Sequence, residues 1–145
     1  MPSQRDLEDL LPSLEKFCAI DASLGMRILG KAPQGMRIDF PFEGIATGPH
    51  WDGERPVVGI DYSTVREDGN MDLMIYGVIG EKRDSVAYTA RGVSIANPDQ
   101  SADPKELITF QTGNQDLAWL NSEIGVALGH GETGRLTLEI YLVKA

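Results

Sequence analysis

The stretch that decides the fold is residues 57–79, VVGIDYSTVREDGNMDLMIYGVI. Both halves follow a period of two, which is typical of strands because successive side chains of a strand point to opposite faces. Between the halves, Asp68-Gly69-Asn70 accepts the positive φ angles that a tight hairpin requires. We therefore expect two strands, residues 57–67 and 71–79, joined by a hairpin turn at Asp68-Gly69.

The same pattern extends in both directions from this hairpin. It predicts further strands at residues 16–22, 36–40, 85–95, 107–112, 117–128 and 135–143. An extended loop is expected at residues 96–105, rich in Pro, Asp and Ser, and a glycine-rich hairpin connection at 129–134. Seven or eight short strands punctuated by turns indicate an all-β barrel or sandwich. The expected fold is a single antiparallel β-barrel of about eight strands.

The N-terminal segment has a different periodicity. Within residues 4–14, four leucines recur at helical spacing, and Pro12 would end or kink a helix there. A short N-terminal helix is therefore predicted, so that residues 1–13 form a helical extension of one domain spanning residues 1–145. At 145 residues the chain is long enough to bury a core without disulfide bonds.

Charge and cysteine content restrict the classes of partner and compartment. The net charge of -9 argues against nucleic acid and anionic membrane surfaces, which attract clusters of Lys and Arg. No apolar run approaches the roughly 20 residues that span a bilayer. The N-terminus lacks the basic-then-apolar order of a signal peptide, and Cys18 is the single cysteine of the sequence. A reducing cytoplasm is the expected location.

Metal, nucleotide and nucleophile motifs are weak in this sequence. His50 and His130 are far apart, and His130 sits among glycines that do not precede a helix. Cys18 lies on an apolar strand, where a buried thiol is usually inert. We therefore expect neither a metal site nor a cofactor.

Candidates for acid–base chemistry lie on the predicted strands. Asp61 stands in the middle of an apolar strand, and burial there would raise its pKa into the range of a general acid or base. Arg91 is a candidate clamp for substrate oxygens, and Tyr76 and Tyr88 could donate protons inside a cavity. The alternatives are an outward-facing Asp61, a rim salt bridge for Arg91, and half-buried packing for the tyrosines.

The run Asp116-Leu117-Ala118-Trp119-Leu120-Asn121 suggests a ligand-facing strand. In a strand, Trp119 and Asn121 would share one face. A ring beside an amide suits a site for a flat or carbonyl-bearing small molecule. On the last strand, leucines alternate with Thr137, Glu139 and Tyr141, but the pattern does not say which face points inward.

Several short motifs together resemble the family labelled domain of unknown function 3237. They are Gly48-Pro49-x-x-x-Gly53, Gly59-x-Asp61-Tyr62, Arg66-x-Asp68-Gly69, Arg91-Gly92, Phe110-x-Thr112-Gly113, Trp119-Leu120-Asn121 and Tyr141-x-Val143. Their order and spacing match the family over roughly residues 14–143.

The resemblance implies a small antiparallel barrel that binds a ligand inside, with cofactor-free lyase, isomerase or cyclase chemistry. The positions carried over from the family pattern are Asp61, Tyr62, Arg91, Thr112, Trp119 and Asn121. The strand reading Met74-Ile75-Tyr76 departs from the family, because relatives often carry an Asp and an Arg there. The segment before Phe110 is also shorter than in many relatives.

Three functions remain open from the sequence. The first is a cofactor-independent enzyme acting on an aromatic or carbonyl-bearing metabolite, with Asp61, Arg91 and Tyr76 as catalytic residues. Its substrate-binding residues would be Trp119, Asn121, Tyr62, Tyr88 and Thr112. The second is a barrel that binds a small hydrophobic ligand without turnover. The third is a structural subunit that dimerises through exposed leucines of its last strand, and a homodimer is the expected assembly.

Overall fold

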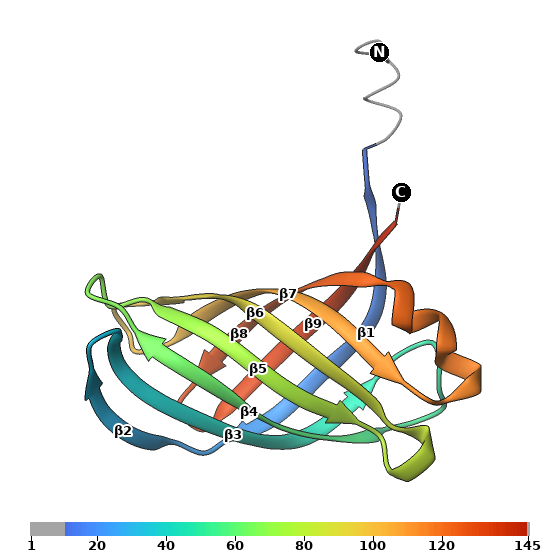
Figure 1. The fold of residues 1–145 in the computed structure, drawn as a ribbon, viewed down its shortest axis with the longest axis horizontal. Coiled ribbons are helices and arrows are strands. Elements are labelled where there is room, and N and C mark those ends of the chain that lie inside the picture. The colour runs from blue at the N-terminus through green and yellow to red at the C-terminus, as the bar shows by residue number, and fades with distance from the viewer. Residues whose placement is uncertain (1–10, 145) are drawn as a thin grey trace.

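The computed structural model describes residues 11–144 and contains nine antiparallel strands and two short 3₁₀ helices (Figure 1). The elements in chain order are β1 (Ser13–Leu24), β2 (Arg27–Ala32), β3 (Gly35–Thr47), β4 (Arg55–Val65), β5 (Met71–Ile79), η1 (Lys82–Asp84), β6 (Val86–Ala96), β7 (Ala102–Thr112), η2 (Gln115–Ser122), β8 (Ile124–Glu132) and β9 (Arg135–Lys144). The prediction of an all-β fold is confirmed.

Eight of these strands close into a barrel, and β2 is an additional strand. Neighbouring strands follow the order β1-β9-β8-β7-β6-β5-β4-β3-β2, and a further pairing of β1 with β3 closes the ring. That pairing runs from Ala19 opposite Thr47 to Leu24 opposite Phe42. Because closure removes the exposed edges of a sheet, the fold does not need a second sheet to cover it.

The strand periodicity separates an apolar interior from the outer wall. On β9, Leu138, Ile140 and Leu142 are buried, while Thr137 and Glu139 between them are exposed. The hypothesis of a dimer through these leucines therefore loses its basis, because they fill the interior of the barrel. On β5, Leu73 and the following alternate residues point inward in the same way.

The hairpin at the centre of the sequence forms as expected. Gly69 adopts a φ of +85°, and the backbone N–H of Asn70 donates to the Asp68 carboxylate over 3.0 Å. Val65 pairs with Met71 across the turn. The local chemistry of Asp-Gly thus sets the register of β4 against β5.

Three expectations about the elements need correction. The strand expected over residues 117–128 is wrong in its first half, which is the 3₁₀ helix η2. The loop expected at residues 96–105 ends early, because β7 begins at Ala102. Strand β2 is missing from the predicted set; it pairs with β3 alone, and its residues Ile28 and Leu29 are exposed, as is Met26 just before it.

The predicted N-terminal helix falls mostly on residues 1–10, which lie outside the described residues. Its predicted end is wrong, because Ser13 and Leu14 already belong to β1 and pair with Lys144 and Val143 of β9. In Figure 1 this pair of strand ends extends away from the barrel.

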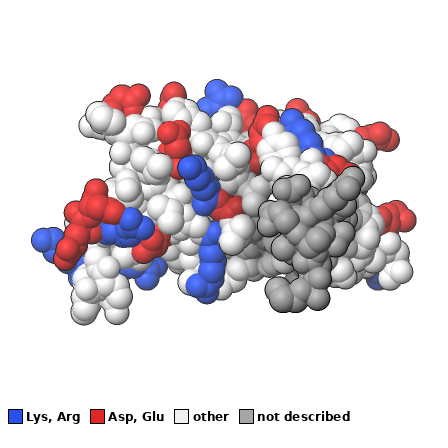
Figure 2. All heavy atoms as spheres, turned by 90° about the horizontal axis from the view of Figure 1, so that it is seen from above, with Lys and Arg blue, Asp and Glu red and all other residues white. Residues whose placement is uncertain are grey.

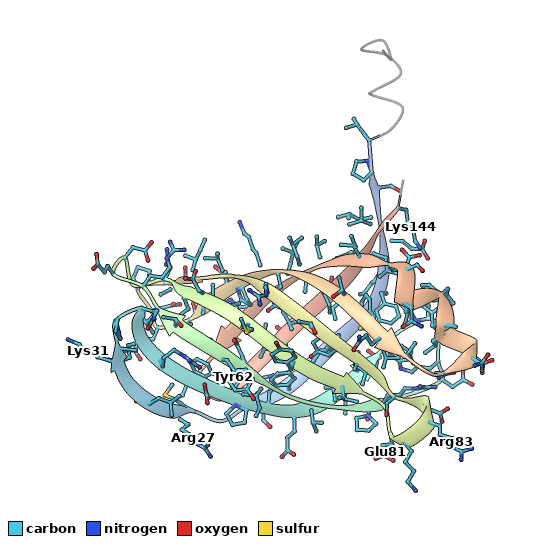
Figure 3. All side chains as sticks on the ribbon, in the orientation of Figure 1. Arg27, Lys31, Tyr62, Glu81, Arg83 and Lys144 are labelled. Atoms are coloured by element: carbon cyan, nitrogen blue, oxygen red, sulfur yellow. The ribbon has the colours of Figure 1, made fainter. Side chains whose placement is uncertain are left out.

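The outer surface carries both signs of charge. Figure 2 shows Lys and Arg interspersed with Asp and Glu on one face of the molecule. In Figure 3, Arg27 and Lys31 project from β2 at one end of the barrel, and Glu81 and Arg83 project from the turn at the other. Within residues 11–144, neither helix has the length and apolar character needed to cross a membrane.

Candidate functional site

The interior of the barrel holds a cavity of about 550 Å³ that opens toward the β2 end. Apolar side chains from β3, β5 and β9 form most of its wall: Ile38, Phe40, Phe42, Leu73, Ile75 and Leu138. Residues of the β1–β2 and β8–β9 turns line it as well, including Met26 and Thr133. A mostly apolar cavity of this size is typical of small-molecule sites.

The opposite end of the barrel is closed by packed aromatic rings. Phe17 lies at the centre, with ring-centroid distances of 5.4 Å to Phe110, 5.6 Å to Trp51 and 6.4 Å to Trp119. These three contacts are edge-on, which is a favoured geometry for aromatic pairs. The cavity therefore has its mouth at the β2 end.

Three ionisable side chains reach the cavity from three strands. They are Asp61 of β4, Tyr88 of β6 and Glu106 of β7. Each occupies an inward position, since its strand neighbours two residues away also point inside. The strand alternation thus brings to one interior space three groups that are far apart in sequence.

Asp61 presents a free oxygen to this apolar surrounding. Its Oδ1 atom is buried and has no hydrogen-bond partner among the described residues. Burial raises the pKa of Asp61 to about 6, while the nearby Ser63 hydroxyl and the backbone of Met74 favour the charged form. The carboxylate is therefore poised to exchange a proton near neutral pH.

Glu106 is buried more deeply than Asp61 and is only 6% exposed. Burial, followed by the negative charge of Asp61, raises the pKa of Glu106 to about 8. The two carboxyls consequently differ in protonation at neutral pH, with Asp61 charged and Glu106 neutral. Such a separation of two acids is a common arrangement in acid–base sites.

Tyr88 places a phenol beside the two carboxyls. Its hydroxyl is buried without a hydrogen-bond partner in the described structure, and burial raises the pKa of the phenol strongly. The ring lies over Gly77 of β5, where a Cβ atom would stand 2.3 Å from Tyr88 Cζ. A glycine at that position is therefore required for the ring to lie in the cavity.

The cavity contains no basic side chain. Its lining within residues 11–144 includes Asp61 and Glu106 in the interior and Glu132 at the β8–β9 turn, but no Lys, Arg or His. A negatively charged ligand would meet no counter-charge there. Within residues 11–144, no three side chains of His, Cys, Asp or Glu lie close enough together to hold a metal ion.

Three of the predicted site residues lie on the outer wall. Arg91 is exposed on β6, Tyr76 on β5 is 51% exposed, and Tyr62 on β4 pairs edge-on with Tyr76 (Figure 3). Tyr62 directly follows the inward-facing Asp61, and Arg91 directly follows the inward-facing Ala90. Because successive side chains of a strand point to opposite faces, Tyr62 and Arg91 point outward. The structure therefore does not bring Arg91 or Tyr76 to the cavity that Asp61 lines.

Trp119, Asn121 and Thr112 lie at the closed end, away from the cavity lining. Trp119 and Asn121 do not share a strand face, because both belong to η2. The Asn121 side chain accepts from the Thr112 backbone N–H over 2.8 Å and donates to its carbonyl over 2.9 Å. The Thr112 hydroxyl donates to the carbonyl of Ser85. These contacts fasten η2 to β7.

Of the predicted site residues, Asp61 and Tyr88 line the cavity, and the prediction did not include Glu106, which lines it as well. Glu106 lies between the expected loop at residues 96–105 and the expected strand at residues 107–112, so the prediction gave it no place on a strand face. The signal was present, because Glu106, Ile108 and Phe110 alternate with exposed Lys105, Leu107 and Thr109. An acid that shares one face of a strand with two apolar residues is expected to point into the interior.

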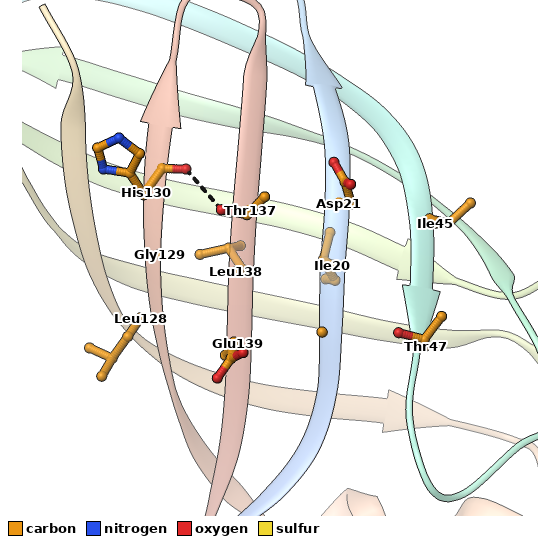
Figure 4. A pocket seen from close by; sticks show the side chains of 11 residues that line it. Ile20, Asp21, Ile45, Thr47, Leu128, Gly129, His130, Thr137, Leu138 and Glu139 are labelled. Atoms are coloured by element: carbon orange, nitrogen blue, oxygen red, sulfur yellow. Dashed lines mark hydrogen bonds between the residues drawn. The ribbon is translucent and has the colours of Figure 1, made fainter.

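A second, shallower hollow lies on the outer wall across β1, β3, β8 and β9 (Figure 4). It has a volume of about 310 Å³, and Asp21, Thr47, His130, Thr137 and Glu139 supply its polar atoms. Asp21 is already paired with Arg135 over 2.8 Å, and His130 with Asp103 over 2.9 Å. The charged groups Asp21 and His130 are thus already paired with residues outside the hollow, unlike Asp61 Oδ1 in the interior.

Comparison with known families gives one match over nearly the whole chain. The model of the family described as "Protein of unknown function (DUF3237)" matches residues 12–143. No curated protein matches the chain significantly.

Solved structures with the same fold come from bacteria and a fungus. A protein of unknown function from Clostridium acetobutylicum superposes with a TM-score of 0.79 at 19% identity, covering 92% of this chain and 97% of that one. A β-barrel-like protein from Acinetobacter baumannii gives 0.79 at 17% identity, covering 92% and 96%. An enzyme from Penicillium herquei gives 0.62 at 19% identity, covering 99% and 98%. At these identities the likeness establishes the fold alone.

Proposed function

This chain belongs to the family of proteins of unknown function DUF3237, and from the cavity within its barrel we propose that it binds an apolar small molecule and moves a proton on it. The ligand class is an aromatic or carbonyl-bearing metabolite. The reaction class is cofactor-independent lyase, isomerase or cyclase chemistry. The similarity to a fungal enzyme is consistent with catalysis on this fold.

The observation that carries the proposal is the free carboxylate oxygen of Asp61. A buried Oδ1 without a hydrogen-bond partner lowers the stability of the fold. A ligand bound in the cavity would contact this oxygen and compensate for the missing partner. Its raised pKa of about 6 keeps Asp61 basic enough to accept a proton and acidic enough to return it near neutral pH.

In the proposed step, the Asp61 carboxylate removes a proton from the carbon next to a ligand carbonyl. The electron pair of that C–H bond moves into the C–C bond, and the carbonyl π electrons move to oxygen, which gives an enolate. Asp61 then returns the proton to the same carbon, or to the γ-carbon where a second double bond of the ligand is conjugated with the enolate. The step needs no oxidant, and the proton count of the carboxyl is restored at the end.

Exchange of a carbon-bound proton with deuterium tests this role without knowledge of the natural substrate. The probe is 2-acetylnaphthalene in D₂O, with loss of the α-proton signal followed by NMR. We expect the wild-type protein to accelerate exchange and Asp61→Asn to remove at least about a hundredfold of that acceleration, the usual size of general base catalysis. The rate should rise as pH passes through about 6, because Asp61 is deprotonated in that range.

The matched control is Asp72→Asn, which neutralises an exposed aspartate that pairs with Arg66 on the outer wall. It should leave exchange unchanged. Affinity for the probe should stay within about tenfold in Asp61→Asn, a change of about 1.4 kcal/mol. Equal exchange rates in wild type and Asp61→Asn would remove the base role. Binding without any acceleration would favour the alternative function, a non-catalytic ligand-binding barrel.

A further inference from the structure

The proposed proton transfer by Asp61 does not involve two other groups of the cavity, Tyr88 and Glu106. The Tyr88 hydroxyl is buried, lines the cavity and has no partner in the part of the chain that the structure describes. Glu106 lines the same cavity from the neighbouring strand β7. A buried hydroxyl without a hydrogen bond costs about 1–3 kcal/mol, so its retention calls for a ligand atom.

We propose that the cavity selects an uncharged ligand with an acceptor oxygen, that the Tyr88 hydroxyl donates to this oxygen, and that the negative charge of Asp61 excludes anions. This inference rests on the proposed small-molecule function and names the substrate class of the same site. The ligand class is an apolar ketone or similar carbonyl compound, as opposed to a carboxylate, a phosphate or an ammonium compound.

The strand register places the proposed donor next to the base. Asp61 is aligned with Ile75, and Ile75 with Ala90 of β6. Tyr88 is the next inward residue on β6, and two strand residues span about 7 Å. The Tyr88 ring lies over Gly77 of the intervening strand β5 and so leans toward β4, where Gly59 is the partner of Gly77 and Asp61 is the next inward residue. A carbonyl oxygen on Tyr88 can thus have its α-carbon near Asp61 Oδ1.

Glu106 lies in the row on the other side of Asp61. It pairs with Gly92, which is two residues beyond Ala90 on β6. With Asp61 charged, Glu106 stays protonated at neutral pH, because burial and that charge hold its pKa at about 8. A neutral carboxyl donates an O–H as Tyr88 does, so donors outnumber acceptors around the ligand. This balance favours a ligand that accepts hydrogen bonds.

Exclusion of anions follows from the charges that face the cavity. Asp61 of β4 carries the negative charge in the interior, the acid Glu132 lies at the β8–β9 turn, and no basic residue within the described chain lines the space. A carboxylate placed beside Asp61 would raise the energy of both charges without compensation. A cationic ligand would pair with Asp61, yet it offers no acceptor to Tyr88.

Four naphthalene compounds of matched shape test the inference by calorimetry at neutral pH. They are 2-acetylnaphthalene, 2-ethylnaphthalene, 2-naphthoate and protonated 1-(2-naphthyl)ethylamine. We expect the ketone to bind about tenfold more tightly than the ethyl compound, a difference of about 1.4 kcal/mol, because only the ketone gives the buried Tyr88 hydroxyl an acceptor. The naphthoate should bind at least about a hundredfold more weakly than the ketone.

Tyr88→Phe removes the hydroxyl and keeps the ring. It should erase the preference for the ketone and leave the affinity for 2-ethylnaphthalene within about twofold. Tyr62→Phe is the matched control on the outer wall and should change neither affinity. Asp61→Asn should narrow the discrimination against naphthoate to about tenfold or less.

The infrared band of the bound ketone gives a direct reading of the hydrogen bond. With a ¹³C-labelled carbonyl, the stretch should lie at lower frequency in the wild type than in Tyr88→Phe. An unshifted band, or a preference for the ketone that survives in Tyr88→Phe, would overturn the Tyr88 assignment. Tightest binding of the amine would overturn the uncharged ligand class. Loss of proton exchange in Asp61→Asn is measured separately, so the base role and this inference can fail independently.

Discussion

Glu106 connects the protonation of the cavity to the stability of the fold. Its carboxyl is almost completely buried, and its pKa rises from 4.5 to about 8. A carboxyl whose folded-state pKa exceeds its unfolded-state pKa stabilises the fold below the unfolded value. That contribution is lost as pH rises through the folded value. At neutral pH, Glu106 therefore lowers the free energy of unfolding, whereas an apolar residue at this position would not.

Glu106→Gln should therefore stabilise the protein increasingly as pH rises. Gln keeps the shape and an N–H donor but does not ionise. The gain in unfolding free energy over the wild type should grow between about pH 5 and about pH 8, by about 1.36 kcal/mol for each unit of pKa difference. Urea unfolding across this range measures it. Glu43→Gln, on an exposed residue of β3, controls for removal of one charge, and a gain for Glu106→Gln that falls with rising pH would contradict the assignment.

At the scale of elements, η2 depends on a small number of side-chain hydrogen bonds. Asn121 binds both backbone groups of Thr112 and also the carbonyl of Ala118 over 3.1 Å. At the other end, the Asn114 side chain accepts from the backbone N–H of Asp116. Leu117 and Leu120 between them are buried against the aromatic end of the barrel. The helix therefore acts as a cap on the closed end.

Asn121→Ala should loosen this cap without changing the cavity. Loss of the paired contacts to Thr112 should lower the unfolding free energy by about 1–2 kcal/mol, because each net hydrogen bond contributes about 0.5–1.5 kcal/mol. Affinity for 2-ethylnaphthalene should stay within about twofold, since η2 and the cavity mouth lie at opposite ends (Figure 1). Ser122→Ala, on an exposed neighbour, is the control. A large loss of affinity in Asn121→Ala would indicate that the amide serves the ligand directly.

The same element shows where sequence patterns are informative and where they are not. The β4–β5 hairpin was predictable because its signals, strand alternation and Asp-Gly, are local. Residues 117–122 carry a comparable alternation of Leu, Trp and Asn, but capping by Asn114 and contacts to Thr112 select a 3₁₀ helix. Strand β2 has a weak pattern because it pairs on one side only.

The candidate site was predictable to the same extent. Asp61 stands out because a carboxylate in an apolar strand is unusual, whichever way it points. Arg91 and Tyr76 have suitable chemistry for a catalytic site. Which face of the strand they occupy depends on how the strands pair in the whole barrel, and no local sequence pattern determines that pairing. Glu106 was missed because the strand was expected to begin at residue 107, whereas β7 begins at Ala102.

At the scale of the whole molecule, closure of the barrel depends on contact between β1 and β3. Gly44 lies directly against β1, where a Cβ atom would stand 2.1 Å from the Asp21 carbonyl oxygen and 2.5 Å from the Ala22 Cα. Both are backbone atoms, so no rotamer change could relieve the contact. The absence of a side chain at residue 44 allows the strands to pair and so encloses the cavity.

Gly44→Ala should therefore force β1 and β3 apart. Overpacking of this kind costs about 1–3 kcal/mol, and we expect a loss of unfolding free energy toward the upper end, because the clash is with backbone. Amide hydrogen exchange should accelerate first at the paired residues Ala22 and Ser23. Gly113→Ala is the matched control, since a Cβ there meets nothing within 4 Å, and it should be neutral or slightly stabilising. Equal stability of the two variants would show that the barrel still closes when β1 and β3 lie farther apart at residue 44. The cavity would then not depend on this contact.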